Sequence, residues 1–326
     1  MDLKYPIPHA SAEAFKSFLT KTIPANAGLV FDRFAPDTQE EEKGGGREDP
    51  PKKKGLVQVR DLANKRADKE LLQKWNIRWR ETVKKDHAEP FPKSTDWRFI
   101  TGLGRKGPFE VGFTFNRYGF PYLPGSSVKG IARAQAFYDI AEAVTEEKLK
   151  ILFEKVYENV SEKERKEKNL TPFSALDDAL LMEKQEEFES AFHACNPSKD
   201  AREKADKFRK IFGNTGRAGG AVFFDAIPDD KTLPVLELDI INPHYPDYYE
   251  DQDGKKGKYP TDWQSPVPTY FLTVAPNTKF WFAVGWRGEP NSGLQTDAIQ
   301  WLKAGLENLG AGAKTSAGYG YFKHNH

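Results

Sequence analysis

The order of the predicted elements indicates an α+β protein with a ferredoxin-like (RRM-like) core. An alternating strand at 109–115 precedes a helix at about 126–144. Further strands follow, then a helix at 294–309 and a short final strand at 319–322. Strand, helix, strands, helix and strand is the order of a split βαβ domain.

Hydrophobic periodicity supports the individual elements. Apolar residues occupy every second position from Phe109 to Phe115 and again from Phe280 to Trp286, the period of a half-buried strand. The remaining strand-like segments are 221–227, 235–241, 269–275 and 279–286. Ser126 and Ser127 follow a turn-rich stretch and are good N-cap residues for the first core helix.

The sequence divides into an N-terminal region, residues 1–97, and a core domain, residues 98–326. A helix at 10–20 and a short strand at 29–31 are expected in the N-terminal region. Residues 37–55 are rich in glycine, lysine and glutamate and have almost nothing apolar to bury, which predicts a flexible loop. A basic amphipathic helix or helix pair follows at about 62–83.

Within the core domain, residues 145–210 carry glutamate and lysine at helical spacing. Apolar residues such as Leu149, Leu152, Phe188 and Phe192 recur among them. We therefore expect a charged helical insertion packed on its own apolar face.

Composition excludes several classes of protein. Hydrophobic residues make up 38% of the 326 residues, which is enough for a sizeable core. Charged residues make up 30%, which suits a cytoplasmic protein. No apolar run approaches the ~18–20 residues of a membrane span, and no secretory signal is expected. The single cysteine, Cys195, forms no internal disulfide and makes no zinc cluster.

The net charge of +1 conceals local segregation. Residues 60–85 hold nine basic and four acidic side chains, and residues 98–133 hold six and one. Residues 225–253 hold nine acidic side chains and one basic. Such segregation suits a protein that touches phosphates on one face and a basic neighbour on another, although clustered solvated faces fit it equally.

Two segments have the chemistry of phosphate contacts. Lys129 and Arg133 are four residues apart, just behind the predicted helix N-terminus at Ser126 and Ser127, where unpaired N–H groups attract anions. The spacing alone favours the simpler interpretation of a serine cap with two surface cations. Arg217, in a glycine turn at 212–220, contacts a phosphate or pairs with a neighbouring acid.

The glycine loop, residues 310–320, is the second of these segments. Its glycines permit close approach of a ligand, and donors for phosphate oxygens come from Lys314, Thr315 and Ser316. Tyr319, after Gly318, has a ring on which a base can stack. A helix precedes this loop and a strand follows it, the reverse of a dinucleotide-binding turn, so no nucleotide cofactor is expected. A flexible turn remains the alternative.

The sequence gives little support for a catalytic site or a metal site. Carboxylates and one histidine could in principle form a metal site for phosphodiester hydrolysis: Asp225, Asp229, Asp230, Asp239, His244 and Asp262. No pair has a diagnostic metal-ligand spacing, and solvated or paired acids are the simpler interpretation. His244 has the best context for a general acid or base.

Four blocks in order resemble the RAMP superfamily of CRISPR-associated RNA-binding proteins. They are residues 102–104 (GLG), 121–130 (PYLPGSSVKG), 222–226 (VFFDA) and 312–320 (GAKTSAGYG). The runs 239–245 (DIINPHY) and 260–268 (PTDWQSPVP) are similar to the family of sixth subunits of the Cmr complex, the type III-B effector. Together the matching segments cover about half of the chain.

The resemblance implies a ferredoxin-like core and a non-catalytic RNA-binding subunit, with no cofactor, metal or small-molecule substrate. Its partners would be guide RNA near its 3′ portion, target RNA and the other Cmr subunits at the head end. RNA contacts carried over by the motifs are Ser126, Ser127, Lys129 and the loop residues Lys314, Thr315, Ser316, Gly318 and Tyr319. Arg133 is added because it shares a helix face with Lys129, and Arg217 because of its place in the glycine turn. The alternatives are a RAMP endoribonuclease using His244 and a protein adaptor without RNA contact.

Overall fold

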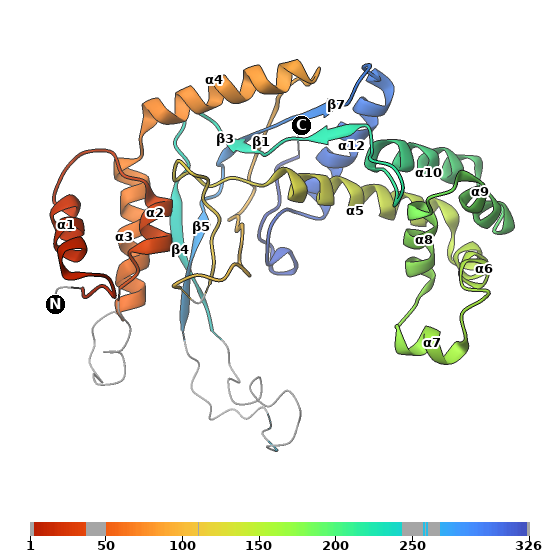
Figure 1. The fold of residues 1–326 in the computed structure, drawn as a ribbon, viewed down its shortest axis with the longest axis horizontal. Coiled ribbons are helices and arrows are strands. Elements are labelled where there is room, and N and C mark those ends of the chain that lie inside the picture. Colours follow the sequence, from red (N-terminus) through yellow and green to blue (C-terminus); the bar gives the residue numbers. More distant parts are fainter. Residues whose placement is uncertain are drawn as a thin grey trace.

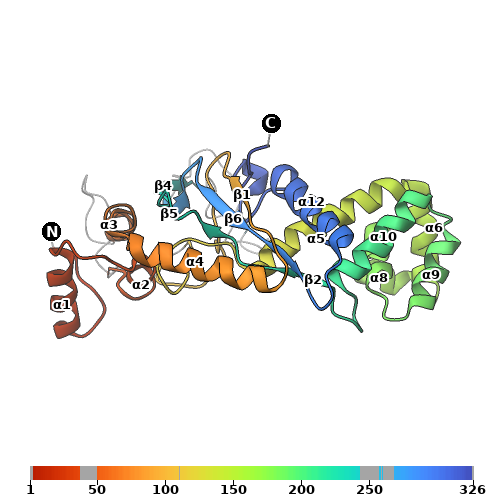
Figure 2. The same ribbon diagram turned by 90° about the horizontal axis from the view of Figure 1, so that it is seen from above.

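The computed structural model describes residues 3–36, 50–109, 111–242, 257, 259 and 268–324. The molecule is elongated, with N-terminal helices at one end, strands in the middle and a group of helices at the other end (Figures 1 and 2). Helices and antiparallel strands are both present, so the predicted α+β class is confirmed. Across the described residues, no helix is long and apolar enough to cross a membrane.

The N-terminal region begins with helices where a strand and part of a loop were predicted. Its helices are α1 (His9–Leu19), α2 (Ala27–Arg33), α3 (Pro51–Arg66) and α4 (Lys69–Lys85). The strand predicted at 29–31 is wrong, because Asn26 caps α2 by accepting a hydrogen bond from the Leu29 N–H at 2.9 Å. Residues 51–55 of the predicted loop are helical, since Pro51 occupies the first turn of α3, where proline is well tolerated. Residues 37–49 lie outside the described part of the chain.

The described strands form three antiparallel sheets. Their bounds are β1 (Phe91–Ser94), β2 (Ala221–Phe223), β3 (Ile227–Pro228), β4 (Leu236–Ile241), β5 (Thr269–Val274), β6 (Lys279–Phe282) and β7 (Val284–Trp286). The sheets have the orders β1-β6-β3, β2-β7 and β4-β5, with Phe91 opposite Phe282 and Leu238 opposite Leu272. Because β1 belongs to the N-terminal region, that region contributes a strand beside β6. The division at residue 97 stays a prediction.

Two predicted strands are wrong. Residues 111–115 form no regular strand: the Gly112 N–H donates to the Leu103 carbonyl and the Thr114 N–H to the Thr101 carbonyl, at 3.1 and 2.9 Å. Their apolar side chains are nevertheless buried, and Phe113 is fully buried. At the C-terminus, a 3-10 helix η2 (Thr315–Ala317) and one bridge between Phe322 and Thr95 replace the predicted strand.

Two long helices lie between the strands and the helical insertion (Figure 2). Helices α5 (Gly125–Val144) and α12 (Ser292–Asn308) lie close to their predicted positions and pack so closely that a Cβ on Gly305 would be 2.8 Å from the Ile131 side chain. The predicted insertion, residues 145–210, is mostly helical, as its spacing predicts. Its helices are α6 (Glu146–Val156), α7 (Glu162–Glu167), α8 (Pro172–Leu181), α9 (Gln185–Ala194) and α10 (Lys199–Phe212).

Strand β6 has a different layer on each of its faces. Trp281 packs toward α4, where the Arg80 guanidinium lies 4.0 Å from its ring centroid. Phe280 and Phe282 point the other way and pack against Phe322, with ring centroids 6.3 and 5.4 Å from it. Alternation along one short strand therefore separates the α4 layer from the layer that holds the C-terminal segment.

A buried ion pair ties β1 to the C-terminal layer. Only 1% of the Lys93 side chain is exposed. Its ammonium pairs with Glu307 of α12, whose side chain is 18% exposed. Lys93 also donates to the Lys323 carbonyl at 3.0 Å, and His324 Nδ1 lies 2.8 Å from Glu307. Burying a charge is tolerated here because a carboxylate and a carbonyl surround it.

We expect Glu307→Ala to lower the free energy of unfolding by about 3 kcal/mol, because it leaves the Lys93 charge buried without its partner. Urea unfolding of both proteins measures the difference. The control is Glu70→Ala, which removes the partner of the exposed Lys74 and should cost far less. Equal losses in the two variants would contradict the assigned role of the buried pair.

Candidate nucleic-acid interface

A pocket of about 310 Å³ lies between α5 and the glycine loop, residues 310–320. It brings together Ser127 and Thr315, two predicted RNA contacts from distant blocks of the sequence. The full lining comes from the first half of α5 and from the end of α12 with the following loop: Ser127, Gly130, Ile131, Ala134, Leu309, Gly310, Gly312 and Thr315. The two segments that were singled out separately in the sequence therefore form one surface.

The glycine loop is fastened to the backbone of residues 98–100. The Ala313 N–H donates to the Ile100 carbonyl at 3.0 Å, and the Gly320 N–H donates to the Arg98 carbonyl at 2.8 Å. Gly312 has a φ of +78°, and a Cβ there would lie 1.9 Å from the Ile100 oxygen. Glycine is required at this position by the approach of the chain's own backbone, whereas the sequence suggested the approach of a ligand.

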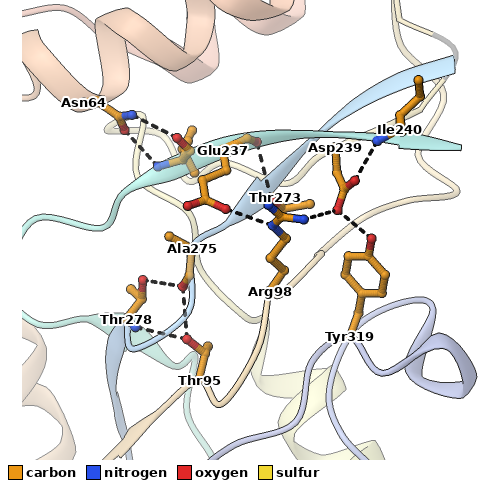
Figure 3. A network of polar contacts seen from close by, with 11 residues as sticks. Asn64, Thr95, Arg98, Glu237, Asp239, Ile240, Thr273, Ala275, Thr278 and Tyr319 are labelled. Carbon is orange, nitrogen blue, oxygen red and sulfur yellow. Dashed lines mark hydrogen bonds and ion pairs between the residues drawn. The ribbon is translucent and has the colours of Figure 1, made fainter. Parts of the chain in front are cut away.

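Tyr319 is held by a polar network at the foot of the loop (Figure 3). Its hydroxyl donates to Asp239 Oδ2 at 2.6 Å. Arg98 bridges the same carboxylate and Glu237, at 2.8 Å to each. Both acids lie on β4, so this network connects β4 to the glycine loop.

The network moves two pKa values in opposite directions. Burial and the hydrogen bond to Asp239 raise the pKa of Tyr319 to about 12. Burial opposes ionisation of Asp239, but hydrogen bonds from Tyr319, the Ile240 N–H and Arg98 outweigh it and lower the pKa of that carboxyl. The neutral phenol and the ionised carboxylate are thus the stable pair at neutral pH.

The other loop residues predicted to contact RNA lie at its surface. Lys314 adopts a left-handed conformation, with φ +59°, and its ammonium lies 5.2 Å from the Phe271 ring centroid and 5.5 Å from that of Tyr319. Ser316 and Gly318 are exposed, and Thr315 is half-buried. The loop thus presents one cation, two hydroxyls and the partly exposed ring of Tyr319.

The N-terminus of α5 differs from its prediction. The helix begins at Gly125 with Pro124 as its N-cap, so Ser126 and Ser127 lie in the first turn with exposed side chains. The Gly125 N–H donates to Asp225 Oδ1 at 2.7 Å. A carboxylate of the chain itself therefore occupies part of the position expected for a phosphate, a long-range contact that has no local signal in the sequence.

Lys129 and Arg133 point away from the pocket, toward the helical insertion. The Lys129 ammonium donates to the Phe212 carbonyl at 2.9 Å, and Arg133 pairs with Asp177 at 2.6 Å. Burial, with the charges of Arg133 and Arg287, lowers the pKa of Lys129. Both cations have internal partners, and their contact with RNA stays a prediction.

Arg217 lies exposed at the tip of the turn that follows α10, apart from the pocket. Its backbone carbonyl accepts a hydrogen bond from the Asn214 N–H at 2.9 Å, which closes the turn. The structure therefore shows how Arg217 is presented to solvent, and its role in RNA binding also stays a prediction.

Three of the described candidate acids have structural partners. Asp225 caps α5, Asp239 belongs to the Tyr319 network, and Asp229 accepts from the Trp281 indole at 2.7 Å. Nowhere in the described part of the chain do three histidine, cysteine or acidic side chains gather as metal ligands. His244 and Asp262 lie outside the described residues.

Comparison with known proteins places the chain in a family. The sequence model of the RAMP superfamily matches residues 44–323. The chain belongs to the RAMP superfamily. The resemblance found in the four sequence blocks is thereby confirmed.

Among RAMP proteins, the chain is similar to CRISPR system Cmr subunit Cmr6 of Pyrococcus furiosus. The two are 36% identical over 256 residues, which cover 77% of this chain and 72% of the relative. A Cmr6 subunit of Saccharolobus solfataricus is 28% identical over 114 residues, 35% of each chain.

Two solved structures are also similar to this RAMP protein. The crystal structure of Pyrococcus furiosus Cmr6 aligns at 30% identity with a TM-score of 0.43, over 74% of this chain and 98% of that one. A chain of the type III-B Cmr-beta complex bound to cognate target RNA aligns at 20% identity with a TM-score of 0.49, over 97% and 87%.

We expect the phenol of Tyr319 to titrate with a pKa of about 12 in the folded RAMP protein. Because ordinary tyrosine titrates near ~10, the stabilisation from its hydrogen bond is complete below pH ~10 and is lost as the pH rises toward 12. The ultraviolet absorbance titration of the wild type minus that of Tyr319→Phe isolates this group. Asp239→Asn should lower the Tyr319 pKa, and a wild-type value near ~10 would refute the network's role.

Proposed function

We propose that this chain is a non-catalytic RNA-binding subunit of a type III-B CRISPR effector complex. Its similarity to Cmr6 over most of its length supports the assignment to that complex. We place it at the head end, in contact with the 3′ portion of the guide RNA and with target RNA. A ferredoxin-like core is part of the proposal, supported by membership of the superfamily.

The single observation that carries the RNA-binding proposal is the shared pocket of Ser127 and Thr315. Two polar segments far apart in the chain converge there, and Lys314, which is half-buried, lies next to Thr315 in the chain. The loop that carries Lys314 and Thr315 is held rigidly by backbone hydrogen bonds, so little conformational entropy is lost when the loop binds RNA. A rigid loop with hydroxyls and a cation suits contacts to an RNA backbone.

We expect Lys314→Ala to weaken binding of single-stranded RNA and to reduce the slope of log affinity against log salt by about 0.7, since one phosphate contact releases about that many counterions. Binding isotherms at several salt concentrations measure both quantities. Lys163→Ala is the control: Lys163 is exposed on α7, at the far end of the insertion, and its loss should change neither. An unchanged salt slope in Lys314→Ala would refute the loop as the phosphate contact.

Repeat-containing CRISPR precursor RNA should remain intact after incubation with the purified protein, because the proposal assigns it no catalytic centre. Denaturing gel electrophoresis of the RNA measures the outcome. Discrete cleavage products that vanish in His244→Ala would instead establish a processing endoribonuclease. RNA-protein crosslinking inside the assembled complex separates the proposal from a pure adaptor, which would form no crosslinks.

A further inference from the structure

Among the residues that the structure describes, no charged side chain lines the pocket between α5 and the glycine loop. Its surface consists of glycines, aliphatic side chains of Ile131, Ala134 and Leu309, and the hydroxyl residues Ser127 and Thr315. A phosphate placed against this lining would find no cation among the lining residues. The part of a nucleotide that suits this lining is therefore its uncharged part.

Size and chemistry narrow the ligand further. A volume of about 310 Å³ lies at the lower end of small-molecule sites, so the pocket holds one base with its ribose and not a run of nucleotides. A nucleobase has flat apolar faces and polar edges, which match the aliphatic side chains and the two hydroxyls. Single-stranded RNA exposes its bases for contacts of this kind, whereas a duplex hides them.

The position of the nearest loop cation agrees with this division of the nucleotide. Lys314 precedes Thr315 in the chain, but its side chain lies over Phe271 and Tyr319 and does not line the pocket. A base inside the pocket would leave its phosphates outside, on the surface of the loop that carries Lys314.

We propose that this pocket binds one unpaired nucleobase of the RNA. The inference rests on the proposed RNA-binding function and adds to it the part of the nucleotide that enters. It assigns Ser127 and Thr315 to the base or ribose, and leaves the phosphates to the cations outside.

Gly130 offers a way to fill the pocket without disturbing the fold. A Cβ built on Gly130 meets no atom within 4 Å, so a larger side chain there occupies open space and narrows the pocket. Leucine also has a higher helix propensity than glycine, so Gly130→Leu should fold. Gly293→Leu is the matched control, because it makes the same change at the opposite end of α12 from Leu309, where a Cβ has one ordinary contact, Asn291 Oδ1 at 3.7 Å.

The test compares two RNAs of about 12 nucleotides, within the range of site sizes known for single-strand binders. One is oligouridylate, and the other is the same ribose-phosphate chain without bases. The wild type and Gly293→Leu should bind oligouridylate about tenfold more tightly than the abasic chain, the size of one base contact. Gly130→Leu should bind both RNAs equally, with the affinity of the wild type for the abasic chain.

The outcomes separate this inference from the function on which it rests. If Gly130→Leu keeps the wild-type preference for oligouridylate, the base-binding pocket is refuted, while RNA binding through the loop stands. Equal wild-type affinities for the two RNAs would refute the pocket in the same way. If the wild type binds neither RNA, the proposed function fails and the pocket assignment fails with it.

Discussion

The two faces of strand β6 hold the two layers of the molecule together. Trp281 packs under α4, whereas Phe280 and Phe282 pack against Phe322 in the C-terminal segment. Since successive side chains of a strand point to opposite faces, these layers cannot exchange partners without losing the register with β1 and β3. The glycine loop, which leads into Phe322, is thereby positioned by the same strand that anchors the basic helix α4 on the other side.

The glycines of the loop have a different structural role from the one that the sequence suggested. They suggested room for a ligand, yet Gly312 and Gly320 are required because backbone oxygens of Ile100 and Ala311 lie within 1.9 Å of where a Cβ would be. Close packing against residues 98–100 makes the loop rigid, and that rigidity presents Thr315 to the pocket. The proposed binding surface is thus a consequence of backbone packing, with few side chains left to make specific contacts.

Predictions from periodicity succeeded where amphipathic segments decide the structure, as in α12 and the insertion. They failed for segments that are buried without pairing in a regular strand ladder. The sequence of residues 109–115 alternates like a strand, and its apolar side chains are buried, but two backbone hydrogen bonds from residues 112 and 114 to residues 101–103 replace a regular ladder. Three apolar residues at 29–31 were too few to separate helix from strand, and the Asn26 cap decided for helix. Pairing partners, unlike burial, are set by residues far away in the sequence.

The candidate site, like the fold, could be predicted from the sequence only in part. Helical spacing correctly placed Lys129 and Arg133 on one face of α5, but only the position of the insertion shows that this face meets Phe212 and Asp177. The other face, with Ser127, Gly130 and Ile131, lines the pocket. One helix therefore separates internal cations from a neutral cavity. An RNA strand has the complementary division, with charge on its backbone and uncharged bases, so a neutral cavity bordered by a loop that carries Lys314 can distinguish the two parts of each nucleotide without any base-specific contact.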